Sequence, residues 1–246
     1  KVLHEGDELS FSASAQYLFG APVAQGQLSW SVVRDGTSSY PEQWSRYTFT
    51  PIGASSPSGT ITGGATRLDA EGRAQLTATL TLGVARRGRV ALEAEVTDQA
   101  GHTYSARERV ALYPAEYEVG LRRGDDWVEF EEEIDLEAIV IDHEGELVEG
   151  RTVNARFIRE GWHSWWEWSS NARTDGPLDD EGYRLRRNQR REEVHSCELT
   201  SDAVPIHCLY TPTRPGTYRL EVTTQDDQGR RSTASRRFRP RPKSRW

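Results

Sequence analysis

Alternation of apolar and polar residues runs along most of the chain and predicts β-strands. Residues 8–14, 73–82, 128–141 and 218–222 place small or apolar side chains at every second position. A strand with one buried face and one solvent-facing face has this period of two. The strands are short and follow one another at intervals of roughly 8 to 12 residues, a spacing typical of antiparallel β-sandwiches. We therefore predict an all-β protein.

Four Asp-x-x-Gly segments separate these strands. They begin at Asp69, Asp98, Asp142 and Asp226. The aspartate side chain can cap such a turn, while the glycine takes the positive φ that closes a hairpin. A calcium loop would need carboxylates at alternating positions, and these segments offer only one or two each. We interpret them as hairpin turns.

The second half of the chain repeats the plan of the first half. Residues 22–34 match residues 147–159, and residues 92–101 match residues 220–229. A repeat spaced by about the length of one small domain indicates tandem copies of a single module. Such repetition favours a scaffold or binding protein over an enzyme with one pocket.

The boundary between the two copies is predicted near Pro114, which ends the last strand of the first copy. A strand pattern resumes at once at Glu116, so we expect a short linker and two sandwiches in contact. The predicted domains are residues 1–114 and residues 115–246. The arginine-rich residues 180–193 lack an apolar face and are expected to form a hairpin or loop excursion. The basic residues at the end of the second copy are interpreted as a last strand leading into a solvated linker, and an electrostatic binding tail is the alternative. These residues are Arg230, Arg231, Arg236, Arg237, Arg239, Arg241, Lys243 and Arg245.

Composition narrows the classes of protein that remain. A chain of 246 residues can bury two small cores, although its apolar share is only 35%. No apolar run approaches the roughly 20 residues that cross a bilayer. The net charge of −7 argues against a nucleic-acid partner, because phosphate binding needs a concentrated basic face. The chain starts at Lys1 and contains no methionine, so we expect a piece of a longer protein.

Motifs for catalysis are missing from the sequence. It has no nucleophile elbow, no phosphate-binding glycine loop and no histidine pair of the zinc-protease type. The adjacent acids Asp125-Asp126 and Asp179-Asp180 lie in polar segments and are interpreted as solvated turns. We therefore predict neither an enzyme nor a cofactor or metal site.

Two cysteines lie close together in the sequence, each beside a histidine. His195 and Cys197 form a His-x-Cys pair, and His207 directly precedes Cys208. Two imidazoles and two thiolates could bind zinc. However, neighbours in a strand point to opposite faces, and Pro205 suits a bend between the two cysteines. A Cys197–Cys208 disulfide is favoured over zinc or free thiols, and it would place the protein in the periplasm or outside the cell.

The second candidate site is the tryptophan run Trp162, Trp165, Trp166 and Trp168. These side chains could stack on sugar rings or form a partner surface. The favoured alternative is structural: Trp162, Trp166 and Trp168 line an inner or inter-domain face, and Trp165 packs on the other side. The first copy also has aromatic residues just past the matching strand, namely Tyr40, Trp44, Tyr47 and Phe49.

One segment resembles a known family. Residues 16–26, with Tyr17 to Pro22 reading Tyr-Leu-Phe-Gly-Ala-Pro, are similar to a hairpin of alpha-2-macroglobulin proteins, especially the bacterial ones. Residues 68–74 and 116–122 and the paired cysteines before Tyr210 add to the resemblance. It implies two consecutive macroglobulin domains, each a seven-stranded antiparallel β-sandwich of fibronectin III-like appearance. They resemble the third and fourth such domains of the animal protein.

The resemblance also implies a function. Members of this family inhibit many endopeptidases by closing around a protease that has cut their bait region, and many then link to it through a thioester. The bacterial members are thought to protect the periplasm, in some cases anchored to the inner membrane. The implied partners are target proteases, other macroglobulin domains of the same chain, and a peptidoglycan synthase or another periplasmic protein.

The thioester signature Cys-x-Glu-Gln is absent, since Glu198, Leu199 and Thr200 follow Cys197. This chain is therefore expected to be scaffold without bait or thioester. Two other classes stay open. One is an Ig-like adhesin or carbohydrate-binding tandem that uses Trp162–Trp168, and the other is an accessory module of an enzyme.

Overall fold

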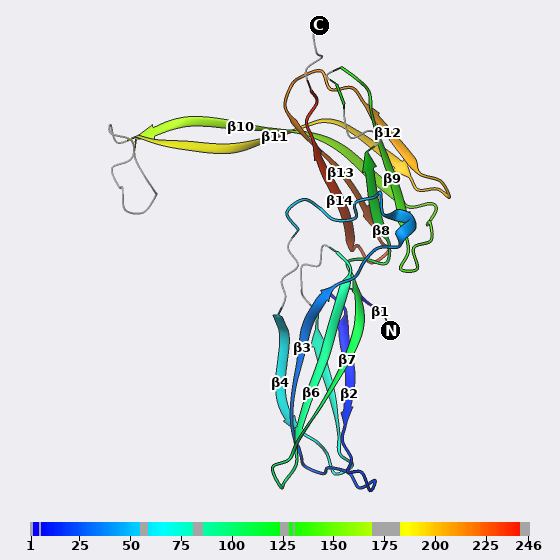
Figure 1. The fold of residues 1–246 in the computed structure, drawn as a ribbon, viewed down its shortest axis with the longest axis vertical. Helices are drawn as coiled ribbons and strands as arrows, with labels where there is room; N and C mark the ends of the chain where they lie inside the picture. The colour runs from blue at the N-terminus through cyan, green and yellow to red at the C-terminus, as the bar shows by residue number, and fades with distance from the viewer. Residues whose placement is uncertain are drawn as a thin grey trace.

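The computed structural model describes residues 2–4, 6–54, 59–80, 86–123, 128–129, 131–168 and 183–241. These residues form two β-sandwiches arranged end to end, with a long hairpin projecting from the second (Figure 1). None of the described residues forms a helix long and apolar enough to cross a membrane. The predicted all-β class is confirmed.

The first domain contains seven strands among its described residues. A five-stranded sheet has the order β1-β7-β6-β3-β4, and β2 and β5 form a second sheet. All pairs are antiparallel except β1, which runs parallel to β7. Buried Leu9, Val32 and Leu112 belong to the core between the sheets. The strands are β1 (Val2–His4), β2 (Glu8–Ser14), β3 (Gln27–Thr37), β4 (Gly59–Arg67), β5 (Arg73–Thr79), β6 (Gly88–Thr97) and β7 (Thr103–Tyr113).

The second domain repeats this plan with seven strands in the described part of its chain. One sheet has the order β11-β10-β13-β14, and the other has the order β12-β9-β8. Phe157, Tyr218 and Leu220 are fully buried between the two sheets. The small sheet here has three strands, whereas its counterpart in the first domain has two. The strands are β8 (Glu118–Arg123), β9 (Ile134–Ile141), β10 (Thr152–Trp168), β11 (Tyr183–Thr200), β12 (Ile206–Tyr210), β13 (Thr217–Gln225) and β14 (Arg231–Phe238).

All four predicted Asp-x-x-Gly turns are present. In each, the glycine N–H donates to the aspartate carbonyl, and the glycine has a φ between +71° and +93°. At Asp98 one carboxylate oxygen also accepts the backbone N–H groups of Ala100 and His102, at 2.9 and 2.8 Å. These side-chain bonds explain why aspartate begins the turn.

One predicted strand is too long. The pattern predicted residues 128–141, but β9 starts only at Ile134. Glu131 has a φ of +68°, a left-handed conformation that interrupts an extended strand. The Glu132 carboxylate accepts the N–H of Glu129 at 2.8 Å and holds this turn.

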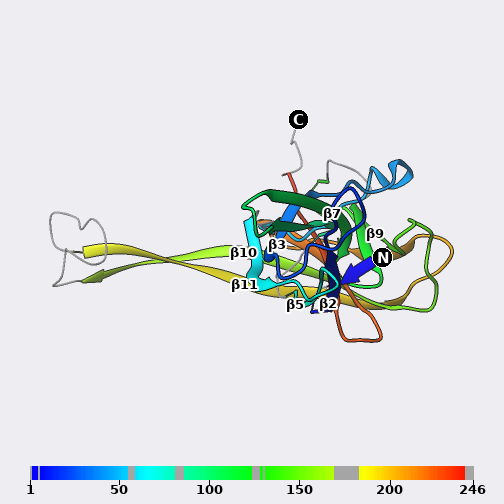
Figure 2. The same cartoon turned by 90° about the horizontal axis from the view of Figure 1, so that it is seen from below.

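The projecting hairpin is an extension of β10 and β11. These two strands pair with each other as far as Trp168 and Tyr183, whereas β13 pairs with β10 only up to Glu160. We call residues 161–168 and 183–190 the arm; it leaves the sandwich as a twisted two-stranded ribbon (Figures 1 and 2). The predicted hairpin at residues 180–193 therefore agrees with the structure from Tyr183 onward.

Candidate functional site

A loop that follows β3 packs against the second domain and makes a contact between the two domains. We call residues 38–53 the clamp loop; it contains the short 3-10 helix η1 (Glu42–Trp44). The loop leaves the first sandwich and lies against β8 and β9 of the second (Figure 1). It contains the four aromatic residues that the sequence analysis noted just past this strand, Tyr40, Trp44, Tyr47 and Phe49.

Aromatic packing makes the centre of this contact. Phe49 is buried against Ile139 and Ile141 of β9, and its ring stacks on Tyr40 with centroids 4.2 Å apart. Gly120 of β8 leaves the space that the Phe49 ring occupies. A Cβ atom at position 120 would lie 2.7 Å from Cε1 of that ring. The absence of a side chain at Gly120 is thus required for this approach.

Backbone hydrogen bonds extend the contact along two strands. Thr48 and Leu121 exchange two N–H···O bonds, each 2.9 Å long, so the clamp loop pairs with β8. The N–H of Ser235 in β14 donates to the Thr50 carbonyl at 3.2 Å, and the Ser235 hydroxyl accepts the N–H of Ile52 at 2.7 Å. The loop is therefore bonded to both sheets of the second domain.

A buried ion pair connects the domains beside the aromatic cluster. Arg87 of the first domain donates through Nε to Glu118 Oε2 at 2.7 Å, and the two side chains are 5% and 1% exposed. The Tyr40 hydroxyl donates to the other carboxylate oxygen at 2.9 Å. The guanidinium carbon lies 4.4 Å from the centroid of the Tyr40 ring and 5.1 Å from that of Tyr113. Burial and the Glu118 charge together raise the pKa of Tyr40, so it remains a neutral donor.

Further polar contacts surround this centre. Trp44 donates its indole N–H to the Gly145 carbonyl at 2.8 Å, in one of the Asp-x-x-Gly turns. Tyr47 donates to Glu137, which is also paired with Arg122 at 3.3 Å. These bonds satisfy aromatic side chains whose rings are packed between the domains.

Two histidines meet on another side of the interface. Nε2 of His4 and Nε2 of His143 lie 3.4 Å apart. Nearby, Arg230 of the second domain pairs with Asp7 of the first at 3.2 Å. Burial and the charge of Arg230 lower the pKa of His4, with a smaller opposing effect from Asp7. This part of the interface is therefore most stable when His4 is neutral.

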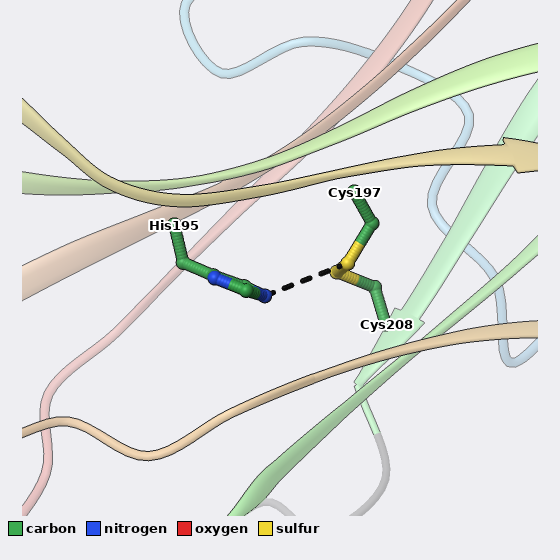
Figure 3. Close-up of side chains that lie close together, drawn as sticks. All are labelled: His195, Cys197 and Cys208. Carbon is green, nitrogen blue, oxygen red and sulfur yellow. Dashed lines mark hydrogen bonds between the residues drawn. A yellow bond between two sulfur atoms is a disulfide. The ribbon is translucent and has the colours of Figure 1, made fainter.

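The predicted Cys197–Cys208 disulfide is present. Its Cα atoms are 6.1 Å apart, and it connects β11 of one sheet to β12 of the other. Nε2 of His195 lies 3.6 Å from Sγ of Cys197 (Figure 3). His207 points elsewhere, because its Nδ1 lies 2.9 Å from Asp135 on the exposed face. The four possible zinc ligands are thus not brought together.

Comparison with known families decides what these domains are. Residues 1–114 match the family described as "Bacterial Alpha-2-macroglobulin MG5 domain", and residues 120–239 match "Bacterial macroglobulin domain 6". The chain belongs to the bacterial alpha-2-macroglobulin family. The resemblance noted in the sequence is confirmed, and the bacterial numbering counts the two domains as the fifth and sixth.

Individual alpha-2-macroglobulins agree with this assignment. An "Alpha-2-macroglobulin homolog" of Nostoc sp. is 22% identical over 226 residues, which are 90% of this chain and 11% of that protein. The native conformation of E. coli alpha-2-macroglobulin superposes with a TM-score of 0.57 at 20% identity, over 98% of this chain and 15% of that one. E. coli alpha-2-macroglobulin activated by porcine elastase gives a TM-score of 0.58 at 21% identity, over 100% of this chain and 21% of that one. The chain thus spans a small part of the length of these alpha-2-macroglobulins.

The structure places the tryptophan run of this alpha-2-macroglobulin segment in the arm. Residues 162–168 belong to β10, and their backbone projects away from both sandwiches (Figure 1). The prediction that Trp162, Trp166 and Trp168 line an inner or inter-domain face concerns side chains and stays a prediction. The side chains of Trp162, Trp165, Trp166 and Trp168 lie outside the described residues, and the sugar-platform interpretation stays a prediction.

Other sequence candidates also fall outside the described chain. The acid pairs Asp125-Asp126 and Asp179-Asp180 and the last two basic residues, Lys243 and Arg245, are in this group. The basic residues of the described C-terminal part are spread over β14 and its flanks, where Arg237 pairs with Glu160 at 2.6 Å.

Sequence reasoning missed the most buried charges of the interface. Arg87 and Glu118 carry no motif, and their separation of 31 positions in sequence gives no hint that they meet. It also missed that the tip of the segment 16–26, which carries the family resemblance, is exposed: Leu18 is 109% and Phe19 81% exposed. One signal for the contact at Gly120 was available in the sequence: this glycine interrupts a strand pattern, and no turn surrounds it.

Proposed function

We propose that this chain is a rigid two-domain segment of an inhibitor that traps proteases. The carrying observation is the interface, which combines a buried Arg87–Glu118 pair, the Phe49 cluster and backbone pairing at Thr48. A linker without such contacts would let the sandwiches move independently. The E. coli relative whose structure was obtained after activation by porcine elastase supports a protease as the partner of the full-length protein.

Rigidity has a mechanical role in this proposal. A large rearrangement is usually carried by domains that move as bodies about a few hinges. The clamp loop removes a hinge between these two domains, because it is bonded to β8 and β14 at once. Movement imposed at one end of the segment would then be passed on to the other end.

Covalent capture is not assigned to this segment. Both of its cysteines are in the disulfide, so it has no thiol for a thioester. The bait and any thioester belong to other parts of the full-length protein under this proposal. The disulfide supports a periplasmic or secreted location, where such bonds persist. Other macroglobulin domains of the same chain, and a peptidoglycan synthase or another periplasmic protein, are the further partners we propose.

The test uses the full-length protein mixed with elastase. Hydrolysis of a large protein substrate and of a small peptide substrate are measured side by side. We expect hydrolysis of the large substrate to fall and hydrolysis of the peptide to continue, because a trapped protease is shielded only by size. Unchanged hydrolysis of the large substrate would overturn the proposal.

Limited proteolysis with mass spectrometry tests the scaffold part separately. Several proteases of different specificity are applied to residues 1–246 and to a version extended beyond Trp246. Intact sandwiches with cutting only in the extension are expected. Ready cutting within either sandwich would contradict a rigid scaffold.

A further inference from the structure

A second chemical cluster lies away from the interface, at the edge of the second sandwich. His195 and Cys197 come from β11, and Cys208 comes from β12 (Figure 3). We propose that reduction of the disulfide turns this corner into a binding site for zinc, with two thiolates and one imidazole as ligands. The inference concerns this chain alone and does not depend on the proposed function.

The positions of the three side chains fit a metal. Their ligand atoms, Nε2 and the two Sγ atoms, lie within 4.8 Å of one another. Zinc takes sulfur at about 2.3 Å and imidazole nitrogen at about 2.0–2.1 Å, so its tetrahedral ligands are separated by roughly 3.5–4 Å. His195 and Cys197 are two positions apart in one strand and therefore share a face. Opening the S–S bond is the main adjustment that a metal would require.

The surroundings hold the imidazole in place. The His195 ring stacks on Tyr210 with centroids 5.5 Å apart and an angle of 15° between the planes. Its centroid is 5.8 Å from that of Phe157, which is fully buried. Nε2 is the atom turned toward the sulfur. The ring thus presents a ligand atom without a change of position.

The burial of the three groups suits a site with one open position. Cys208 is 1% exposed, whereas His195 and Cys197 are half-buried. A cation can therefore reach the cluster from the solvent side, and a water molecule can complete the tetrahedron. Three protein ligands and one water are a usual zinc arrangement.

The redox state decides whether the site exists. A small dithiol supplies the two electrons: the Cys197–Cys208 bond breaks, the dithiol becomes a disulfide, and its two protons pass to the cysteine sulfurs. Zinc then replaces the two thiol protons, which are released to water, and His195 binds as neutral imidazole. In the disulfide the sulfurs carry no charge and are poor ligands, so the oxidised protein does not hold the ion.

His207 provides a matched control within the same chain. It adjoins Cys208 in sequence, as His195 lies close to Cys197. Its ring, however, is bonded to Asp135 on the exposed face at 2.9 Å. Substituting His207 changes the same residue type near the same disulfide without touching the cluster.

The experiment uses the two-domain protein, reduced with dithiothreitol and freed of it under anaerobic conditions. Cobalt(II) serves as the spectroscopic probe and is then displaced by zinc. We expect one equivalent of cobalt to give the visible bands of a tetrahedral thiolate site in reduced wild type and none in the oxidised protein. His195→Gln should weaken binding by more than about tenfold, since even outer-shell partners of a metal cost about 10–100-fold. His207→Gln should leave binding unchanged.

Thermal melting of the reduced protein gives the second readout. Zinc should raise the melting temperature of reduced wild type and of His207→Gln equally, and that of His195→Gln by less. Equal binding by His195→Gln and wild type would overturn the proposal. So would a reduced protein that stays folded without binding cobalt, or one that unfolds and is not restored by zinc.

Discussion

The clamp loop and the arm follow equivalent strands in the two copies but are placed differently: the clamp loop packs against the neighbouring domain, and the arm projects from its sandwich. β3 pairs with β4 and β6, and β10 pairs with β11 and β13 in the same pattern. After β3 the chain leaves the sheet and is packed against the neighbouring domain. After the matching part of β10 the two strands continue to pair and project as a ribbon (Figure 1).

The difference shows that aromatic content does not choose between these outcomes. Both segments are rich in aromatic residues. Phe49 of the clamp loop meets the bare backbone of Gly120, whereas a Cβ placed at Gly161 of the arm would meet nothing within 4 Å. The clamp loop is buried because β8 and β9 present a complementary surface next to it.

The largest effect should come from removing the buried carboxylate of the interface. Glu118→Ala leaves Arg87 buried without its partner and should lower the free energy of unfolding by about 3–5 kcal/mol. We also expect the single unfolding transition to separate into two, one per domain. Urea unfolding measures the loss of free energy, and calorimetry shows whether the transition separates into two.

Glu192→Ala is the control for this substitution, because Glu192 pairs with Arg214 at 2.8 Å on the surface near the arm. It should cost less than about 1 kcal/mol. An equal loss in the two variants would refute the special weight given to the interface pair.

A pair of glycine substitutions compares the two regions directly. Gly120→Ala places a methyl group against the Phe49 ring and should cost about 1–3 kcal/mol. Gly161→Ala in the arm should change stability by no more than about 0.5 kcal/mol. Chemical denaturation of both variants provides the measurement, and Phe49→Leu in the Gly120→Ala background should recover part of the loss. Similar costs at both glycines would show that close packing at the clamp loop is unimportant.

Acid should weaken the interface through His4. Its pKa is lowered in the folded protein by burial and by Arg230, so the unfolded chain binds the proton more readily. Stability is therefore complete above about pH 6.5, the ordinary histidine value, and falls as the pH drops from there through the folded pKa. Melting temperatures between pH 7.5 and pH 5 measure this drop. His4→Gln should flatten the profile in that range, and a profile that keeps its slope in this variant would assign the effect to other groups.

The smallest effect is expected from shortening the arm. Joining Gly161 to Arg190 through an Asn-Gly turn removes the outer ribbon but keeps all pairing between β10 and β13. The free energy of unfolding should change by no more than about 0.5 kcal/mol, and the domains should still unfold together. Calorimetry of the shortened protein tests this. A loss comparable to that of Glu118→Ala would mean that the arm, like the clamp loop, stabilises the fold.

Much of each domain followed from local features of the sequence. The alternating segments became strands because burial of one face requires a period of two. The turns at Asp98 and Asp226 formed as predicted because the capping aspartate and the positive-φ glycine act within a few residues. The disulfide could also be predicted from the sequence, since only 11 positions separate its cysteines. At Glu131, in contrast, a left-handed backbone conformation that the residue type does not suggest delays the start of the predicted strand to Ile134.

Only the tertiary structure decided how the copies are joined and used. The ion pair of Arg87 with Glu118, the fit of Phe49 over Gly120 and the parallel pairing of β1 with β7 all depend on segments that meet after folding. The sequence names both residues of each contact, but it does not show that they lie close together in space. The repeated, strand-rich, disulfide-bonded plan belongs to the sequence, because its causes are local. The burial of the clamp loop and the projection of the arm belong to the fold, because a side chain is buried only where another surface comes to cover it.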